Sequence, residues 1–408
     1  MGPPASGKLS AFKCFASVIK CRSITWSQKC LQGEVIWLRM HLYIIKIKVA
    51  SVKFSLAIPM MKALIGSLLI STFVFEHTQE ARACTRLVYE TGNKTFITGR
   101  SMDWMDTSAK TALWAFPRGM KRDGTVGVNP IRWKAKYGSI AVSFYDAGTA
   151  DGMNEKGLVA NLLYLKEAEL GDAAKSGKPT LTVGAWAQYF LDNFATVGEA
   201  VAAMANSPFT IIAPPLPNGY QAGLHLSLSD ATGDSAILEY IKGKLVIHHG
   251  SQYRVMTNSP TFDQQLALNV YWDKIGGDRF LPGTISAADR FVRTTYYLKL
   301  APKYKDPGLA LASVFSQIRM ISVPLGLADS SNPNIAMTLW RTVADQQAKI
   351  YYFESAIFPA VSWIDINKLD LTEGAVPKVV RIERGQPLAG ELSAALKPAE
   401  PFKWLGSK

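Results

Sequence analysis

Residues 84–104 read CTRLVYETGNKTFITGRSMDW, and the predicted fold follows from this stretch. Two runs rich in β-branched and aromatic residues, TRLVYE and TFITGRSMDW, lie on either side of Thr91-Gly92-Asn93. A pair of such runs around a short segment with turn-forming residues is typical of a β-hairpin. The stretch therefore predicts a hairpin that begins directly after Cys84.

The segment before Cys84 has the three parts of a secretory signal peptide. From Met60 it reads MMKALIGSLLISTFVFEHTQEARAC, with Lys62 as the positive start and residues 63–75 as an apolar stretch too short to span a bilayer. Residues 81–83, Ala-Arg-Ala, form a small-x-small cleavage site. We therefore expect residues 60–83 to be removed, which leaves Cys84 with a free α-amino group.

Two other interpretations of this segment stay open. It could be a buried helix near the start of a domain, or a lipoprotein signal, which also ends at a cysteine. The lipoprotein pattern fits less well, because Arg82 is bulky and charged and residues 76–80 are polar.

Residues 1–59 match no targeting pattern, so we expect translation to start at Met60 or Met61, with a membrane-associated amphipathic extension as the alternative.

Composition argues for a globular protein that does not bind nucleic acid. Hydrophobic residues make up 48% of the 408 residues, enough for a sizeable core. The net charge is +13, but residues 1–83 contain 11 Lys+Arg and 3 Asp+Glu, which leaves 34 and 29, a net of +5, for residues 84–408. That remainder has no Lys/Arg block of the kind that binds phosphate backbones.

Residues 84–408 read as strands, then helices, then strands, which predicts one α+β layered domain. GSIAVSFYD, GLVANLLYL, LHLSLSD and SAILEYIKGKLVIHH have strand character, and AMTLWRTVADQQAKIYYFES, residues 336–355, resembles a second hairpin. Apolar residues three and four apart predict helices within residues 182–207 and 286–302.

Cysteine usage points to a single reactive thiol. The other cysteines, Cys14, Cys21 and Cys30, all precede the cleavage site, so a chain beginning at Cys84 could form no internal disulfide. An N-terminal cysteine brings its own base, because an α-amino group has a pKa of about 7.7–8.0 and can take the thiol proton. A Cys–His hydrolase with His225 as the base remains an alternative.

Five motifs in order make this sequence resemble the choloylglycine hydrolase and penicillin V acylase group of N-terminal-nucleophile hydrolases. They are CTRLVYE with GRSMDW, DGMNEKGLVANLLYL, VMTNSPTFDQQL, LPGTISAADRFVR and the WRTVADQQAKIYYFES region, and they span nearly all of residues 84–408. The resemblance implies a four-layer αββα sandwich, acylation of the cysteine and hydrolysis of the thioester by water. It also implies a homotetramer, and neither a cofactor nor a metal is expected.

The resemblance implies a role for each of six site residues. Cys84 would be the nucleophile, with Asp103 holding its α-amino group and Arg100 favouring thiolate by its charge. Asn258 and the backbone N–H of Tyr164 would donate to the oxyanion. Arg290 matches the family's late arginine, although Arg293 is close enough to stay in consideration. Each has a structural alternative, such as a solvated ion pair or an ordinary turn residue.

Aromatic residues near the nucleophile predict an apolar acyl pocket, formed by Trp104 and Tyr164. Gram-positive bile salt hydrolases tend to carry asparagine where Tyr164 stands, so the sequence is more similar to the Gram-negative branch. We expect a periplasmic or secreted hydrolase of linear amides without a membrane span in its mature form. Its small-molecule N-acyl amide substrate could be a conjugated bile salt, penicillin V or an N-acyl homoserine lactone. The alternative is a non-catalytic envelope lipoprotein acylated at Cys84.

Overall fold

The hairpin predicted after Cys84 is present in the computed structural model, which describes residues 84–276, 280–327, 336–383 and 388–407. Its strands β1 (Thr85–Glu90) and β2 (Phe96–Trp104) pair antiparallel with Arg86 opposite Arg100. The predicted signal peptide, its cleavage site and residues 1–59 lie outside the described residues.

The hairpin belongs to the first of two large sheets. Among the described residues this sheet has seven strands in the order β14-β1-β2-β15-β16-β17-β19. The bounds of the other five strands are β14 Val255–Thr257, β15 Met337–Asp345, β16 Ile350–Ser355, β17 Val361–Asp365 and β19 Gly390–Glu391. The predicted second hairpin is confirmed, because β15 and β16 pair antiparallel.

The second large sheet has nine strands in the described part of the chain, in the order β13-β12-β11-β8-β7-β6-β3-β18-β20. Their bounds are β3 Thr111–Phe116, β6 Ser139–Phe144, β7 Gly148–Asn154, β8 Val159–Tyr164, β11 Leu224–Ser229, β12 Ser235–Ile241, β13 Lys244–His249, β18 Lys378–Ile382 and β20 Lys397–Pro398. Two small sheets pair β4 (Lys121–Asp123) with β5 (Arg132–Lys134) and β9 (Thr180–Thr182) with β10 (Thr210–Ile212).

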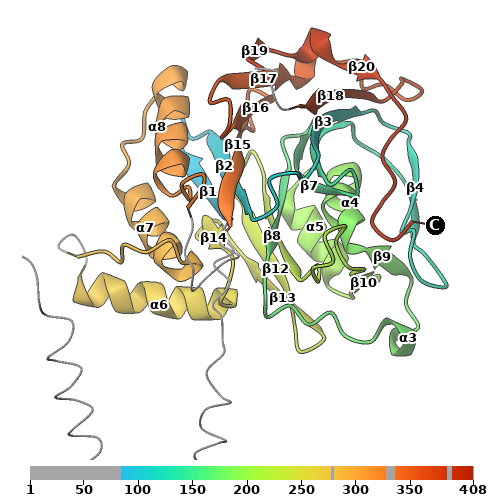
Figure 1. Ribbon diagram of the computed structural model, residues 1–408, viewed down its shortest axis with the longest axis horizontal. Coiled ribbons are helices and arrows are strands. Elements are labelled where there is room, and N and C mark those ends of the chain that lie inside the picture. Colours follow the sequence, from blue (N-terminus) through green and yellow to red (C-terminus); the bar gives the residue numbers. More distant parts are fainter. Residues whose placement is uncertain (1–83, 277–279, 328–335, 384–387, 408) are drawn as a thin grey trace, which may run out of the picture. The chain divides into compact units, whose positions relative to one another are not determined.

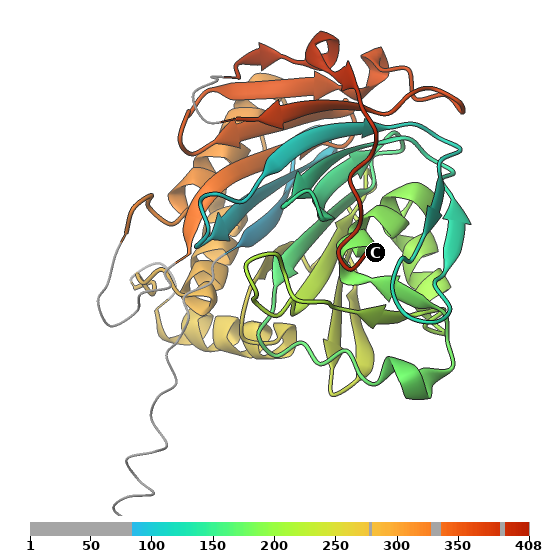
Figure 2. The same ribbon diagram turned by 45° about the vertical axis from the view of Figure 1, so that its right-hand side comes forward.

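Helices cover the outer face of each large sheet, so that the layers run helix, sheet, sheet, helix (Figures 1 and 2). On the second sheet lie α4 (Trp186–Asn193) and α5 (Val197–Met204), with the short α3 (Ala173–Ser176) nearby. On the first sheet lie α7 (Ala287–Leu300) and α8 (Pro307–Met320), and α6 (Phe262–Ile275) packs on α7. The expected αββα sandwich is confirmed.

Strand alternation divides the hairpin residues between the two faces of the first sheet. Leu87 and Ile97 pack against α8, while Arg86 reaches the second sheet, where its Nη2 donates to Leu228 O at 2.9 Å. Gly99 also faces α8, and a Cβ there would lie 2.8 Å from Val314 Cγ1. A glycine at this position lets the helix pack closely on the hairpin.

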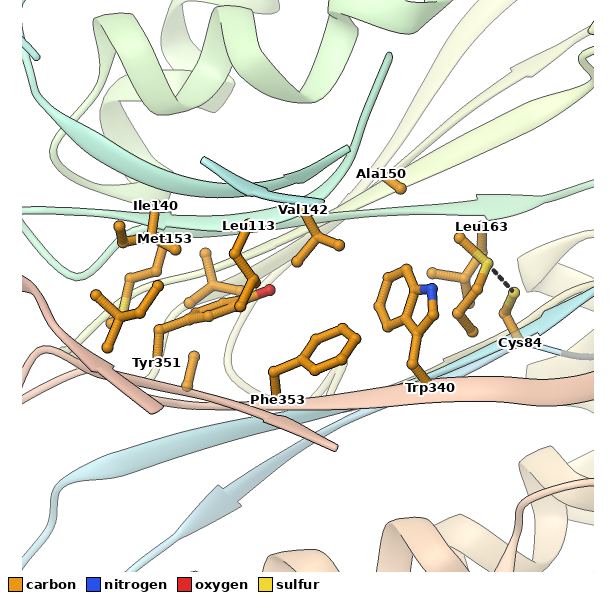
Figure 3. Packing of buried hydrophobic residues seen from close by; sticks show 14 of the residues in the cluster. Cys84, Leu113, Ile140, Val142, Ala150, Met153, Leu163, Trp340, Tyr351 and Phe353 are labelled. Carbon is orange, nitrogen blue, oxygen red and sulfur yellow. Dashed lines mark hydrogen bonds between the residues drawn. The ribbon is translucent and has the colours of Figure 1, made fainter. Parts of the chain in front are cut away.

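The largest apolar cluster fills the space between the sheets (Figure 3). Trp340, Tyr351 and Phe353 extend from the first sheet toward Leu113 and Val142 of the second. All five side chains are buried. Because this layer is closely packed, the strands that form the site are held in fixed register.

The helices differ from the expectation in two ways. The periodic segment 182–207 forms two helices, because Phe194 is extended and the Thr196 side chain caps a new helix by accepting from Glu199 N. Helices α6 and α8 were not predicted from apolar spacing. In the described part of the chain, no helix is long and apolar enough to cross a bilayer.

Candidate active site

Cys84 lies at one end of the layer between the sheets, with Trp340 beside it (Figure 3). Its side chain is buried, and its sulfur makes four described contacts. They are Asp103 N at 3.5 Å, Asp103 O at 3.6 Å, Met102 Sδ at 3.9 Å and Arg100 Nη2 at 4.0 Å. The end of β2 therefore surrounds the predicted nucleophile, as the hairpin geometry anticipates.

Arg100 lies between the thiol and a buried carboxylate. Its Nη1 is 3.5 Å from Asp151 Oδ2, its Nη2 donates to Leu162 O at 3.0 Å, and its guanidinium stacks 4.5 Å from the Trp340 ring. Because Arg100 is completely buried, these contacts fix a positive charge close to the sulfur.

Burial nevertheless determines the resting state of the thiol. Desolvation raises the pKa of Cys84, and the Arg100 charge offsets this only in part. The Asp103 carboxylate also raises this pKa, while Arg290 lowers it. The Arg100 charge thus acts in the direction that favours thiolate, while burial, the larger effect, favours the neutral thiol. Attack on a carbonyl therefore needs a base that takes the proton.

Asp103 points to the opposite face of β2 from Arg100. Thr338 Oγ1 donates to its Oδ1, Ser101 Oγ donates to Oδ2 at 3.2 Å, and Arg290 Nη1 lies 3.8 Å from Oδ2. The pairing register of β15 with β2 shifts just after Thr338, next to the hydrogen bond from Thr338 to Asp103. Burial raises the pKa of Asp103 to about 6, although Arg290 and Thr338 favour the charged form. Its role at the α-amino group stays a prediction, since no described bond joins this carboxylate to Cys84 N.

Arg290, and not Arg293, reaches Cys84. From α7, Arg290 Nη1 donates to Cys84 O at 2.9 Å and to Thr85 Oγ1. Arg293 Nη1 instead donates to Pro282 O and Thr284 O, at 2.8 and 2.7 Å. Because Arg290 also faces Asp103, it connects the first residues of β1 to the end of β2.

Asn258 touches both the nitrogen of the nucleophile and the predicted second oxyanion donor. Its Oδ1 accepts from Cys84 N, and its Nδ2 donates to Tyr164 O at 2.6 Å. These partners fix which atom of the amide is nitrogen. One of the two Nδ2–H groups remains for a developing oxyanion.

The register of β8 orients Tyr164 toward Asn258. Leu165 N donates to Gly223 O at 3.0 Å, so Leu165 and Gly223 are a hydrogen-bonded pair. Because bonded and non-bonded pairs alternate in an antiparallel ladder, the N–H and C=O of Tyr164 both point away from β11. Its carbonyl meets Asn258 on that side, and its N–H points to the same side, so its role as the second oxyanion donor stays a prediction.

A buried glutamine, Gln265 on α6, holds the Asn258 segment from behind. Its Nε2 donates to Asn258 O and, at 2.6 Å, to Pro260 O. Its Oε1 accepts from Thr257 Oγ1 at 3.1 Å and from Thr257 N at 3.4 Å. The backbone on both sides of Asn258 is thus tied to one side chain.

An apolar cavity of about 70 Å³ adjoins Cys84. Trp104 and Tyr164 line it as predicted, with ring centroids 6.1 Å apart, together with Phe144 and Tyr145. Trp104 Nε1 donates to Tyr145 Oη at 2.9 Å, which fixes the indole orientation. The cavity suits an apolar acyl group.

His225 does not support the Cys–His alternative. It is fully buried on β11, where its Nδ1 lies 2.9 Å from Glu239 Oε1, and its Nε2 has no hydrogen-bond partner among the described residues. Glu239 in turn accepts from Phe262 N at the start of α6. No described contact joins His225 to Cys84, and the described residues contain no group of side chains that could hold a metal ion.

Sequence reasoning missed three residues of the site. Asp151 lies in the DGMNEKG motif, but nothing in the sequence pairs it with Arg100. Gln265 lies in a motif that carries the resemblance and Thr338 lies just before another, yet their contacts depend on register across distant strands and helices. The one available signal was the place of Asp151, an acidic residue, within a motif that carries the resemblance.

Comparisons with known proteins agree with this geometry. The family model of linear amide C–N hydrolases, choloylglycine hydrolase family, matches residues 84–380. Penicillin V acylase of Pectobacterium atrosepticum is 47% identical over 348 residues, which cover 79% of this chain and 92% of that protein. A bile salt hydrolase/transferase of Clostridium perfringens is 28% identical, covering 71% and 94%.

Solved structures give the same result. Penicillin V acylase from Agrobacterium tumefaciens has a TM-score of 0.73 and 52% identity, covering 79% of this chain and all of that one. A variant of conjugated bile acid hydrolase from Clostridium perfringens has a TM-score of 0.63 and 25% identity, covering 75% and 98%. The chain therefore belongs to the choloylglycine hydrolase family of linear amide C–N hydrolases and is an amidohydrolase that acts on linear amides.

Proposed function

We propose that this protein is an exported acylase whose nucleophile is Cys84, freed as the N-terminal residue by cleavage after Ala83. It acts in the periplasm or outside the cell on amides with an aromatic acyl group, of which the phenoxyacetyl group of penicillin V is the best example. The export signal, the single catalytic domain over residues 84–408 and the homotetramer are parts of this proposal.

The observation that carries the substrate choice is the small apolar cavity beside Cys84, lined by Trp104, Phe144 and Tyr145. Its volume is about 70 Å³. A cavity that binds benzene measures about 150 Å³, so even a phenyl ring requires the lining side chains to move, and a steroid requires much more space. The 47% and 52% identities to penicillin V acylases, against 28% to a bile salt hydrolase/transferase, support the same choice.

The proposed mechanism uses the α-amino group of Cys84 as the base. The amine takes the thiol proton as sulfur attacks the carbonyl carbon, and the carbonyl oxygen becomes an oxyanion that accepts from Asn258 Nδ2 and Tyr164 N. The resulting ammonium gives its proton to the leaving amine as the C–N bond breaks. Water, deprotonated by the same amine, then hydrolyses the thioester and regenerates the thiol.

Two observations support an N-terminal nucleophile. The family match begins at residue 84. Cys84 N lies against Asn258 Oδ1, so a free amine at that position would have an acceptor that orients it toward its own sulfur. His225, the other candidate base, is paired with Glu239.

The test is a substrate panel of penicillin V, glycocholate, taurocholate and a long-chain acyl homoserine lactone, measured with protein that begins at Cys84. Penicillin V is expected to have the highest kcat/KM, and Cys84→Ala should hydrolyse none of the four. A higher value for a bile salt would refute the aryl preference, and an active Ala variant would refute the mechanism. Intact mass addresses the lipoprotein alternative, because acylation of Cys84 adds hundreds of daltons.

A further inference from the structure

A second and larger hollow adjoins the acyl cavity. This groove measures about 1040 Å³ and is lined by parts of residues 127–129, 164–180, 211–213 and 221–223. Tyr164 lines both the groove and the acyl cavity. Because Tyr164 carries a proposed oxyanion donor, a substrate with its acyl group in the small cavity would extend its amine half toward the groove.

Lys166 is fixed at the point where the groove meets the oxyanion donors. It follows Tyr164 by two residues, and its backbone N donates at 3.2 Å to the side chain of Ser259, which follows Asn258. The lysine side chain is exposed and lines the groove. The base of this side chain is thus anchored beside both donors, while its ammonium group can reach a bound molecule.

The charges along the groove favour an anion. Lys166 forms no ion pair with any carboxylate among the described residues, and Lys178, farther along the groove, donates only to the backbone Asn206 O, at 3.2 Å. Asp172, also a lining residue, is paired with Lys175 at 3.1 Å and caps α3. Glu167 is next to Lys166 in sequence but does not line the groove.

We propose that the groove is the binding site for the amine half of the substrate, and that Lys166 selects amides whose amine part carries an anionic group, such as the carboxylate of an amino acid. This inference rests on the proposed function, because it takes the scissile carbonyl to lie at Cys84. The acyl cavity then sets preference for the acyl group, and the groove sets preference for the charge of the leaving amine.

The test compares two substrates that differ only in that charge, N-phenoxyacetylglycine and N-phenoxyacetylglycinamide. Lys166→Met should lower kcat/KM for the glycine compound about fivefold, the upper range for an exposed ion pair, and change it less than about twofold for the neutral glycinamide. The loss should shrink in about 1 M salt, where the screening length is about 3 Å. Lys244→Met removes an exposed lysine that neither lines the groove nor pairs with a carboxylate that lines it, and should leave both substrates unchanged.

Charge reversal provides a second readout. Lys166→Glu should slow the glycine compound further and should accelerate an analogue whose amine part ends in an ammonium group. Equal losses on both substrates with Lys166→Met, or equal effects of Lys166→Met and Lys244→Met, would overturn the inference and leave the proposed function intact. If the wild-type protein hydrolyses none of the three compounds, the proposed function is wrong and the inference fails with it.

Discussion

Replacing Gln265 by leucine tests whether the position of Asn258 is built by the protein around it. The substitution removes the amide that donates to Asn258 O and Pro260 O and accepts from Thr257. Leucine has nearly the same volume, so the packing of α6 changes little. Two buried backbone groups, Asn258 O and Thr257 N, lose their hydrogen-bond partner, which should lower the free energy of unfolding by about 2–6 kcal/mol, at about 1–3 kcal/mol for each group.

The kinetic effect should be specific to the transition state. Complete loss of one oxyanion donor lowers kcat by about 10²–10³, and a displaced donor should lower it less, by about 10- to 100-fold. KM should change by less than about twofold, because the oxyanion forms only as the carbonyl is attacked. Steady-state hydrolysis of penicillin V by protein beginning at Cys84, below the unfolding temperature of the variant, gives both constants.

Gln346→Leu is the matched control. Gln346 is also fully buried, its Oε1 accepts from Thr98 Oγ1 at 3.0 Å, and its Nε2 donates to Gly157 O at 3.1 Å. The control should lose comparable stability with kcat unchanged. If both variants lower kcat equally, or if Gln265→Leu keeps full kcat, Gln265 does not position Asn258.

Three further substitutions examine other parts of the site. Asn258→Ala should lower kcat by about 10²–10³ with little change in KM, in the same assay. Asp103→Asn should remove a pH dependence of stability. Burial raises the pKa of Asp103 from 3.8 to about 6, so between these two pH values its carboxyl is protonated in the folded protein but ionised in the unfolded chain. The free energy of unfolding of the wild type therefore falls by up to about 3 kcal/mol as pH rises through this window. Urea unfolding at pH 4 and pH 7 should show that loss in the wild type but not in the variant, and equal slopes would contradict the assignment. Trp104→Ala should lower stability by about 3–5 kcal/mol and raise KM for penicillin V about tenfold, because it removes one wall of the acyl cavity. An unchanged KM would place the acyl group elsewhere.

Local sequence patterns were enough to predict two hairpins of the first sheet. The β1–β2 and β15–β16 hairpins were predicted because each pairs two strand-like runs across a short turn. Helix α7 was predicted because its apolar residues follow helical spacing, and in the structure the Ser286 side chain caps its start. Helix α6 was missed because it exposes apolar residues such as Tyr271 and Ile275, so its spacing shows no clear buried face.

The resemblance supplied the site residues, but the sequence could not supply their contacts. That Arg290 and not Arg293 reaches Cys84 depends on which face of α7 meets β1. The partnership of Arg100 with Asp151 joins the two sheets, and no local pattern specifies which strands face each other. Burial raises the pKa of the Cys84 thiol more than the Arg100 charge lowers it, and this balance too follows only from the packed structure.

The most direct measurement compares two proteins that differ by one residue, one beginning at Cys84 and the other at Ala83, with both N-termini verified by intact mass before and after the assay. Penicillin V hydrolysis is expected only from the protein that begins at Cys84, because a peptide bond at its nitrogen removes the base. Equal kcat for the protein that keeps Ala83 would contradict the claim that the terminal amine activates the thiol.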